Sequence, residues 1–219
     1  ATLSVTGLTT LNDGTTTING SLIGDVTLNS GGTLTTAVGS TLGSGTETIT
    51  NNGSINMTLN GFLDGTLVTT GTSVTMLGNG ARLGAVTNTA GTLTMQDGAV
   101  GTTVTIDGDA AFNGTLVYEV ELEGGVGASN PAGDVINVGG NLTGDVDLQF
   151  VNLSLDGSGN EVFGEVDGIT VLTYGGTNSL NFNSITGLPQ FGAFQYFLND
   201  NSAGSVTVQT RVNSGVASL

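Results

Sequence analysis

The sequence predicts an all-β fold, namely a right-handed parallel β-helix with three sides and about 20 residues per coil. Three observations support this fold class. Glycines recur at a nearly constant spacing, each interval contains three turn signals, and the segments between turns alternate apolar and polar residues. Right-handedness is expected because parallel crossover connections strongly prefer it.

The glycine spacing sets the length of a coil. Gly24, Gly45, Gly65 and Gly84 lie 21, 20 and 19 residues apart. Two further turns follow inside each unit, many of them Asn-Gly pairs, and both residue types tolerate the positive φ that tight turns need. Antiparallel hairpins in a β-sandwich are the alternative, because they use the same turns, but they do not usually keep one spacing through four units.

The segments between turns predict which side chains stack. Aliphatic residues alternate with threonine at period two, so that one face points inward. Corresponding positions in successive units should then form aliphatic stacks, which bury a core that no single unit could bury alone. The first stack is Leu22, Leu42, Leu63 and Leu83, and the second is Leu34, Ile55, Val74 and Leu93.

The composition changes near residue 112, which divides the chain into β-helix repeats over 1–112 and a longer-stranded segment over 113–219 that continues the solenoid. Of the 11 aromatic residues, only Phe62 precedes Phe112. Aromatic side chains bury large areas, so the C-terminal half is expected to be the better packed and more stable one. Its first strand alternates strictly, with an acidic ladder on the face that we expect to be exposed: Glu119, Glu121 and Glu123.

The charge balance and the missing residue types exclude several functions. Arg82 and Arg211 are the only basic residues against 18 acidic ones, and the net charge is -16. Nucleic acid is therefore excluded as a partner, and no direct membrane insertion is expected. The chain has no His and no Cys, so catalytic triads and most transition-metal sites cannot be built. We expect no cofactor and no enzymatic activity.

One segment resembles a calcium loop. Residues 156–160 copy the oxygen spacing at the start of an EF-hand, and Asp167 stands at its twelfth position, but Glu161 replaces the glycine of the sharp turn. We interpret Asp156–Asp167 as a solvated acidic loop and expect no metal there.

Two other patterns suggest further functions. The acidic ladder could supply paired carboxylates for glycoside hydrolysis, but the basic residues that β-helical lyases need are absent nearby. Outward threonine pairs on a flat β-helix face are typical of ice binding, although threonine is also a common outward strand residue. The pairs are Thr15/Thr17, Thr33/Thr35, Thr46/Thr48, Thr87/Thr89, Thr92/Thr94 and Thr103/Thr105, and on the second wall Ser54/Asn56 and Ser73/Thr75 interrupt them.

Several stretches carry a family resemblance. The units AGTLTMQDG (90–98) and NGTLVYEVE (113–121) look like associated β-strand repeats. They are followed by GDVINVGGNLTGDVDLQFV (133–151), GITVLTYGG (168–176) and FQYFLNDNSAGSVTVQT (194–210). This order resembles the stem of bacterial autotransporter passenger domains, the secreted part of type V secretion, ending in an autochaperone segment. The resemblance implies a secreted or cell-surface location in a Gram-negative bacterium, and an outer-membrane β-barrel translocator of the same precursor as partner.

The resulting hypothesis is a non-enzymatic, surface-displayed stem whose C-terminal half nucleates folding and secretion of the passenger. Once outside the cell this half can fold first, and each preceding repeat then stacks on an existing edge. An adhesin that binds a host surface, a glycan or another passenger copy through a solenoid face is the alternative, and a polysaccharide-acting enzyme or an ice-binding protein is less favoured. The expected folding nucleus is Tyr118, Ile136, Val138, Phe150, Val171, Leu172, Tyr174, Phe194, Tyr196 and Phe197.

Overall fold

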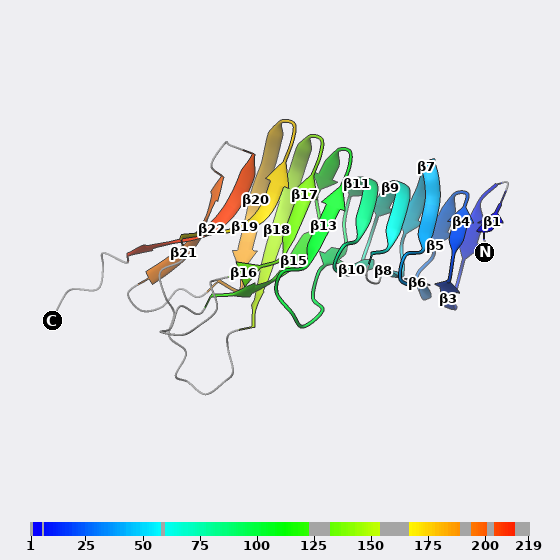
Figure 1. Cartoon of the computed structure of the whole chain (residues 1–219), viewed down its shortest axis with the longest axis horizontal. Coiled ribbons are helices and arrows are strands. Elements are labelled where there is room, and N and C mark those ends of the chain that lie inside the picture. The colour runs from blue at the N-terminus through cyan, green and yellow to red at the C-terminus, as the bar shows by residue number, and fades with distance from the viewer. Residues whose placement is uncertain are drawn as a thin grey trace.

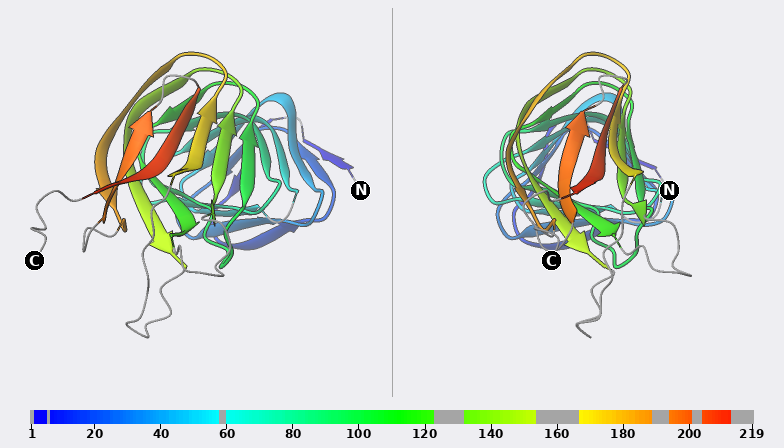
Figure 2. Two further views of the ribbon diagram at one scale, coloured as in Figure 1. Left: turned by 60° about the vertical axis from the view of Figure 1, so that its left-hand side comes forward. Right: turned by 90° about the vertical axis from the view of Figure 1, so that its left-hand side faces the viewer.

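Successive coils of β-strand stack along one long axis in the computed structural model (Figure 1). The structure describes residues 2–5, 7–57, 60–122, 132–153, 167–188, 194–200 and 204–212. These residues form 22 strands and no helix. Viewed near the long axis, the strands of successive coils lie behind one another around a common interior (Figure 2). The prediction of an all-β, parallel β-helix is confirmed.

The strands form three walls, and the strands within each wall run parallel to one another. The long strands bend from one wall to the next. Wall A contains β1 (Thr2–Ser4), β4 (Ser21–Ile23), the first parts of β7 (Thr41–Asn51), β9 (Phe62–Thr69) and β11 (Arg82–Asn88), then β13 (Thr103–Ile106), β17 (Val135–Val138) and β19 (Asp167–Tyr174). Wall B contains β2 (Thr9–Leu11), β5 (Val26–Leu28), the remainders of β7, β9 and β11, then β14 (Ala110–Phe112) and the first parts of β18 (Leu142–Asn152) and β20 (Asn178–Thr186).

Wall C contains β3 (Gly14–Ile18), β6 (Gly32–Thr36), β8 (Ser54–Met57), β10 (Val74–Leu77), β12 (Thr92–Thr94), β15 (Thr115–Glu121) and the last parts of β18 and β20. Three antiparallel pairings lie at the C-terminal end. They join β16 (Ala132–Gly133) to β15, and β22 (Ser205–Val212) to both β19 and β21 (Phe194–Asp200). The hairpin of β21 and β22 thus pairs with the last strand of wall A. Within the described ranges, no helix is long and apolar enough to cross a membrane.

The first predicted stack is confirmed on wall A. Leu22 pairs in register with Leu42, Leu42 with Leu63, and Leu63 with Leu83, and all four side chains are buried. Burial of each leucine contributes about 1.5–3 kcal/mol, and the stacked register lets neighbouring coils share that burial.

The second predicted stack is wrong at one position. Leu34, Ile55 and Leu93 point inward on wall C, but the residue that pairs with Ile55 and Leu93 is Thr75, not Val74. Val74 is 40% exposed, whereas Thr75 is fully buried. The physical reason is Asn51, a buried residue of wall B whose Nδ2 donates to Thr75 Oγ1 at 2.9 Å and to the Val74 carbonyl at 3.0 Å. These hydrogen bonds satisfy a polar group inside the core.

The turn inside β7 needs a glycine and a carboxylate. Gly43 has φ +81, and a Cβ there would lie 2.1 Å from the Asp64 carbonyl oxygen, so only glycine fits. Glu47 holds the bulge by accepting the Ser44 hydroxyl at 2.7 Å and the backbone N–H groups of Ser44 and Thr46 at 2.6 and 3.1 Å. These bonds, first the Ser44 hydroxyl, lower the pKa of Glu47 from 4.5 to about 2.

Parallel stacking continues past Phe112 while the coils grow. Ala110 pairs with Leu142, and Thr115 with Asp147. Side-chain hydrogen bonds between adjacent coils join residues 17 to 25 positions apart before this point, as for Arg82 and Asp107, and 30 to 38 positions apart after it. The extra residues belong to the connections after β15 and β18.

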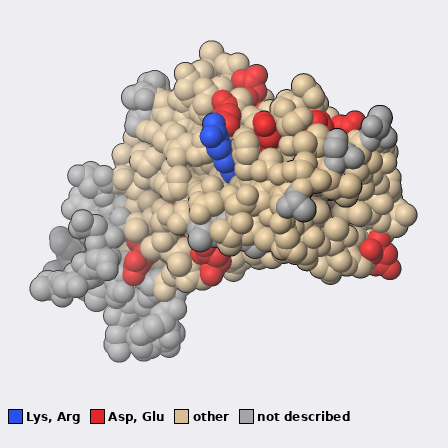
Figure 3. Space-filling model, turned by 45° about the vertical axis from the view of Figure 1, so that its right-hand side comes forward, with Lys and Arg blue, Asp and Glu red and all other residues tan. Residues whose placement is uncertain are grey.

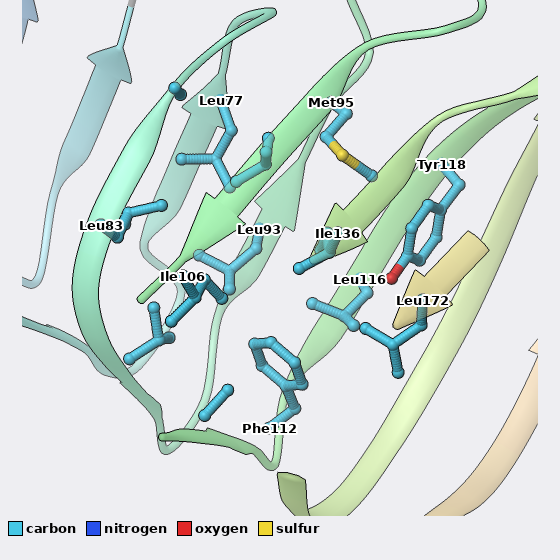
Figure 4. Close-up of a cluster of buried hydrophobic side chains, with 14 of the residues drawn as sticks. Leu77, Leu83, Leu93, Met95, Ile106, Phe112, Leu116, Tyr118, Ile136 and Leu172 are labelled. Atoms are coloured by element: carbon cyan, nitrogen blue, oxygen red, sulfur yellow. The ribbon is translucent and has the colours of Figure 1, made fainter. Parts of the chain in front are cut away.

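One continuous core runs through the coils. It changes from aliphatic stacks to a larger, partly aromatic cluster in which Phe112, Leu116 and Tyr118 point toward the interior (Figure 4). The Tyr118 and Phe150 rings stack with centroids 5.8 Å apart and planes at 24°. Such pairs contribute about 0.5–1.5 kcal/mol beyond the burial of their area.

Candidate functional site: the coil junction at β15

Most of the predicted folding-nucleus residues lie in the core around β15, β17 and β18. Tyr118, Ile136, Val138, Phe150, Val171, Leu172 and Tyr196 are each at most 3% exposed. Ile136 pairs with Leu172, and Val138 with Tyr174, which is partly buried against the core. The remaining two residues lie in β21, a strand of the C-terminal hairpin. Phe197 is half-buried, and Phe194 pairs with Val212 at the end of β21.

The prediction of an exposed acidic ladder is wrong at Glu119. This residue points away from the coil interior, as its alternation with Tyr118 requires, yet it is only 1% exposed. Its carboxylate accepts the backbone N–H groups of Asp97, Gly98 and Ala99 at 2.8–3.1 Å. The segment after β12 therefore lies over the outer face of β15, so that Glu119 binds backbone rather than water. Glu121 is half-buried, and Glu123 lies outside the described residues.

A second buried carboxylate, Asp134, fixes the other side of the same strand. Its Oδ1 accepts the N–H of Thr102 at 3.0 Å, and its Oδ2 accepts the N–H of Glu119 at 2.7 Å. Burial raises the pKa of Asp134 from 3.8 to about 7, the two backbone hydrogen bonds oppose that rise, and the charges of Glu119 and Asp97 add to it. Nothing in the local sequence distinguished Asp134 from an ordinary acidic residue at the start of a strand.

Asp97 completes this network. Its Oδ2 accepts the Thr102 hydroxyl at 3.0 Å, and its Oδ1 accepts the N–H of Ala99 at 3.0 Å. We call Asp97, Thr102, Glu119 and Asp134 the junction network. It joins the connection between β12 and β13 to β15 and to the start of β17. It thus links the last of the short coils to the first of the long ones, beside the Tyr118–Phe150 stack.

The buried carboxylates of the junction network bind backbone groups of neighbouring segments. The carboxylates of Glu119 and Asp134 are at most 1% exposed, and each accepts at least two backbone N–H groups. Among the residues that the structure describes, no three acidic side chains are grouped so that they could hold a metal ion. The predicted acidic loop Asp156–Asp167 lies outside the described residues, apart from the backbone of Asp167 at the start of β19.

The threonine pairs do not share one face. Thr15/Thr17, Thr33/Thr35 and Thr92/Thr94 belong to wall C, Thr87/Thr89 to wall B, and Thr103/Thr105 to wall A. On wall C the predicted interruption by Ser73 and Thr75 is wrong, because both are buried and the outward residues of β10 are Val74 and Met76.

No protein-family model matches the chain. It is 38% identical over 87 residues to the probable autotransporter YfaL of Escherichia coli (strain K12), an alignment that covers 40% of this chain and 7% of that protein. This partial similarity supports a relation to autotransporter-like proteins and, with it, a secreted or surface-exposed setting in a Gram-negative bacterium.

Proposed function

We propose that the chain is a non-enzymatic stem of an autotransporter-type passenger, and that its C-terminal half nucleates folding of the stem. The observation that carries the proposal is the junction at β15. There the aromatic core and the junction network fasten the long coils to one another and to the adjoining short coil. The similarity to a probable autotransporter supports the passenger role.

The proposed mechanism follows from one-dimensional stacking. A coil buries its inward face only when a neighbouring coil covers it, so the first coil to fold pays the largest entropic cost. The 113–219 region lowers that cost because long strands and buried aromatics let it form a core of its own. Its edge then presents Val135 and Thr115, which pair with Thr103 and Thr92 of the preceding coil. In the precursor, a translocator β-barrel would deliver the chain to the cell surface, where folding would draw it outward.

Limited proteolysis in increasing urea tests the folding order. We expect cleavage to begin within 1–110, while 111–219 stays intact to a higher urea concentration. Survival of 1–110 beyond 111–219 would contradict the proposal. Cleavage outside the described ranges is scored separately from cleavage within the strands that the structure describes.

An adhesive role is the second candidate function. One observation favours it, namely that wall C turns two apolar side chains, Val74 and Met76, toward solvent. Aggregation of cells that display the stem alone would support this role, and its absence in cells with confirmed surface display would count against it.

A further inference from the structure

The first part of β10 reverses the usual placement of apolar residues inward and polar residues outward, although Leu77 at its end is buried. In β6 and β8 the central inward residues, Leu34 and Ile55, are apolar, although Thr36 at the end of β6 is also buried. In β10 and just before it, Ser73 and Thr75 point inward while Val74 and Met76 point outward, 40% and 36% exposed. Val74 lies between Ser54 and Thr92, and Met76 between Asn56 and Thr94, so two apolar residues occupy the centre of a polar face.

This reversal has a cost inside the core. Ser73 Oγ is buried and has no hydrogen-bond partner within the described part of the chain, and an unsatisfied buried polar group is unfavourable. Thr75 is tolerated because Asn51, itself fully buried, donates to it. Positions where the sequence departs from the usual burial pattern, and where neighbouring residues compensate, tend to be functional.

The outer face of wall C is also free of charge over five strands. From β3 to β12 every outward residue is Thr, Ser, Asn, Val or Met, and the first acidic residues on this face are Glu119 and Glu121 of β15 and Asp147 of β18. The nearest carboxylates in the flanking turns, Asp13 and Asp97, accept backbone N–H groups. Other acidic residues lie in the turns between walls A and B, away from the outer face of wall C. In one of these turns Arg82 forms an ion pair with Asp107 at 2.7 Å, and Figure 3 shows the blue side chain beside red ones.

We propose that the outer face of wall C, centred on Val74 and Met76, binds a second copy of this chain face to face. Two copies with a net charge of -16 each repel strongly, and this face lets them approach without opposing carboxylates. An apolar centre with a rim of hydroxyl and amide groups is the usual anatomy of a protein interface. A two-fold arrangement places the same patch on both copies.

The size of the face fits a weak contact. Five strands about 4.8 Å apart and up to five residues long give a face of roughly 19 by 16 Å, on the order of 300 Å² from each copy. That area is below what stable dimers bury, so the association should be concentration-dependent and should strengthen as salt screens the repulsion. This inference deepens the adhesive alternative and is independent of the folding order proposed for the stem.

Sedimentation equilibrium of the full chain, from about 10 μM to 1 mM and at low and high salt, tests the proposal. We expect self-association that Val74→Thr together with Met76→Thr weakens at least about tenfold, since a central apolar pair is lost. Val68→Thr, the same exchange on the outer face of wall B, should leave association unchanged. A monomer throughout, or equal association of the double variant, would overturn it.

Cysteine cross-linking identifies the face directly, because the chain has no native cysteine. Met76→Cys should form disulfide-linked dimers under mild oxidation, and Val68→Cys should not. Equal cross-linking of both variants would show association without this face, and would contradict the proposal even if the protein is dimeric. Circular dichroism of each variant confirms that the fold is retained.

Discussion

Asp134 accepts the backbone N–H of Glu119 at 2.7 Å, while the Glu119 side chain accepts three N–H groups of the segment after β12. The two residues thereby fix β15 from both sides. Each carboxylate is buried, and their mutual repulsion is offset by backbone dipoles. The junction network is therefore sensitive to pH and to the loss of a single acceptor.

The stability of the protein should fall as pH rises from about 4 to about 7. The carboxyl of Asp134 has a pKa of about 7 in the folded chain and 3.8 as its ordinary value. Between these values the folded state keeps a proton that the unfolded state has released, so raising the pH favours unfolding. Urea midpoints at several pH values measure the slope. Asp134→Asn should flatten it in this window, and an unchanged slope would contradict the assignment.

Glu47 should make the stability of the protein depend on pH in the opposite direction, and at lower pH values. Its folded pKa of about 2 lies below 4.5, so its stabilisation is present above pH 4.5 and is lost as the pH falls toward 2. Glu47→Gln should lower the thermal midpoint at pH 6 and lower it much less at pH 2, where about half of the Glu47 carboxyl is protonated. An equal decrease at both pH values would show that the glutamate acts through packing instead of charge.

Replacing Glu119 by Gln should destabilise the chain by about 1–3 kcal/mol, because the buried amide nitrogen cannot accept and the backbone N–H groups of 97–99 lose a partner. Glu121→Gln is the matched control on the same face of β15, and it should change the free energy of unfolding by less than about 0.5 kcal/mol. Equal effects in urea titrations would contradict the role given to Glu119.

Removing the aromatic ring of Tyr118 should strongly reduce the stability of the protein. The side chain is 1% exposed and stacks on Phe150, so Tyr118→Ala should cost about 3–5 kcal/mol. Phe62→Ala removes a half-buried ring from the outer face of wall A, where it lies 5.4 Å from the Arg82 guanidinium, and should cost about 1 kcal/mol or less. Thermal unfolding of both variants tests the contrast. A similar loss of stability in the two variants would show that the buried ring of Tyr118 stabilises the protein no more than the half-buried ring of Phe62.

The repeat and the wall A stack could be predicted because glycine spacing and alternation record them directly. Leu42 and Leu63 occupy equivalent positions in units of nearly equal length. Val74 could not be placed, since its orientation depends on a hydrogen bond from Asn51, which lies 23 residues earlier in the chain. Alternation gave the correct face for Glu119, but it contained no sign of the backbone segment that covers that face.

The order of folding tests the central proposal most directly. Pulsed hydrogen exchange during refolding from denaturant should protect the amides of β15, β17, β18 and β19 before those of β2 to β6. Ile136→Ala, within the expected nucleus, should delay protection throughout the chain, whereas Ile55→Ala, an equally buried isoleucine of a short coil, should delay it only locally. Earlier protection of the N-terminal strands, or an equal delay from both variants, would contradict a C-terminal nucleus.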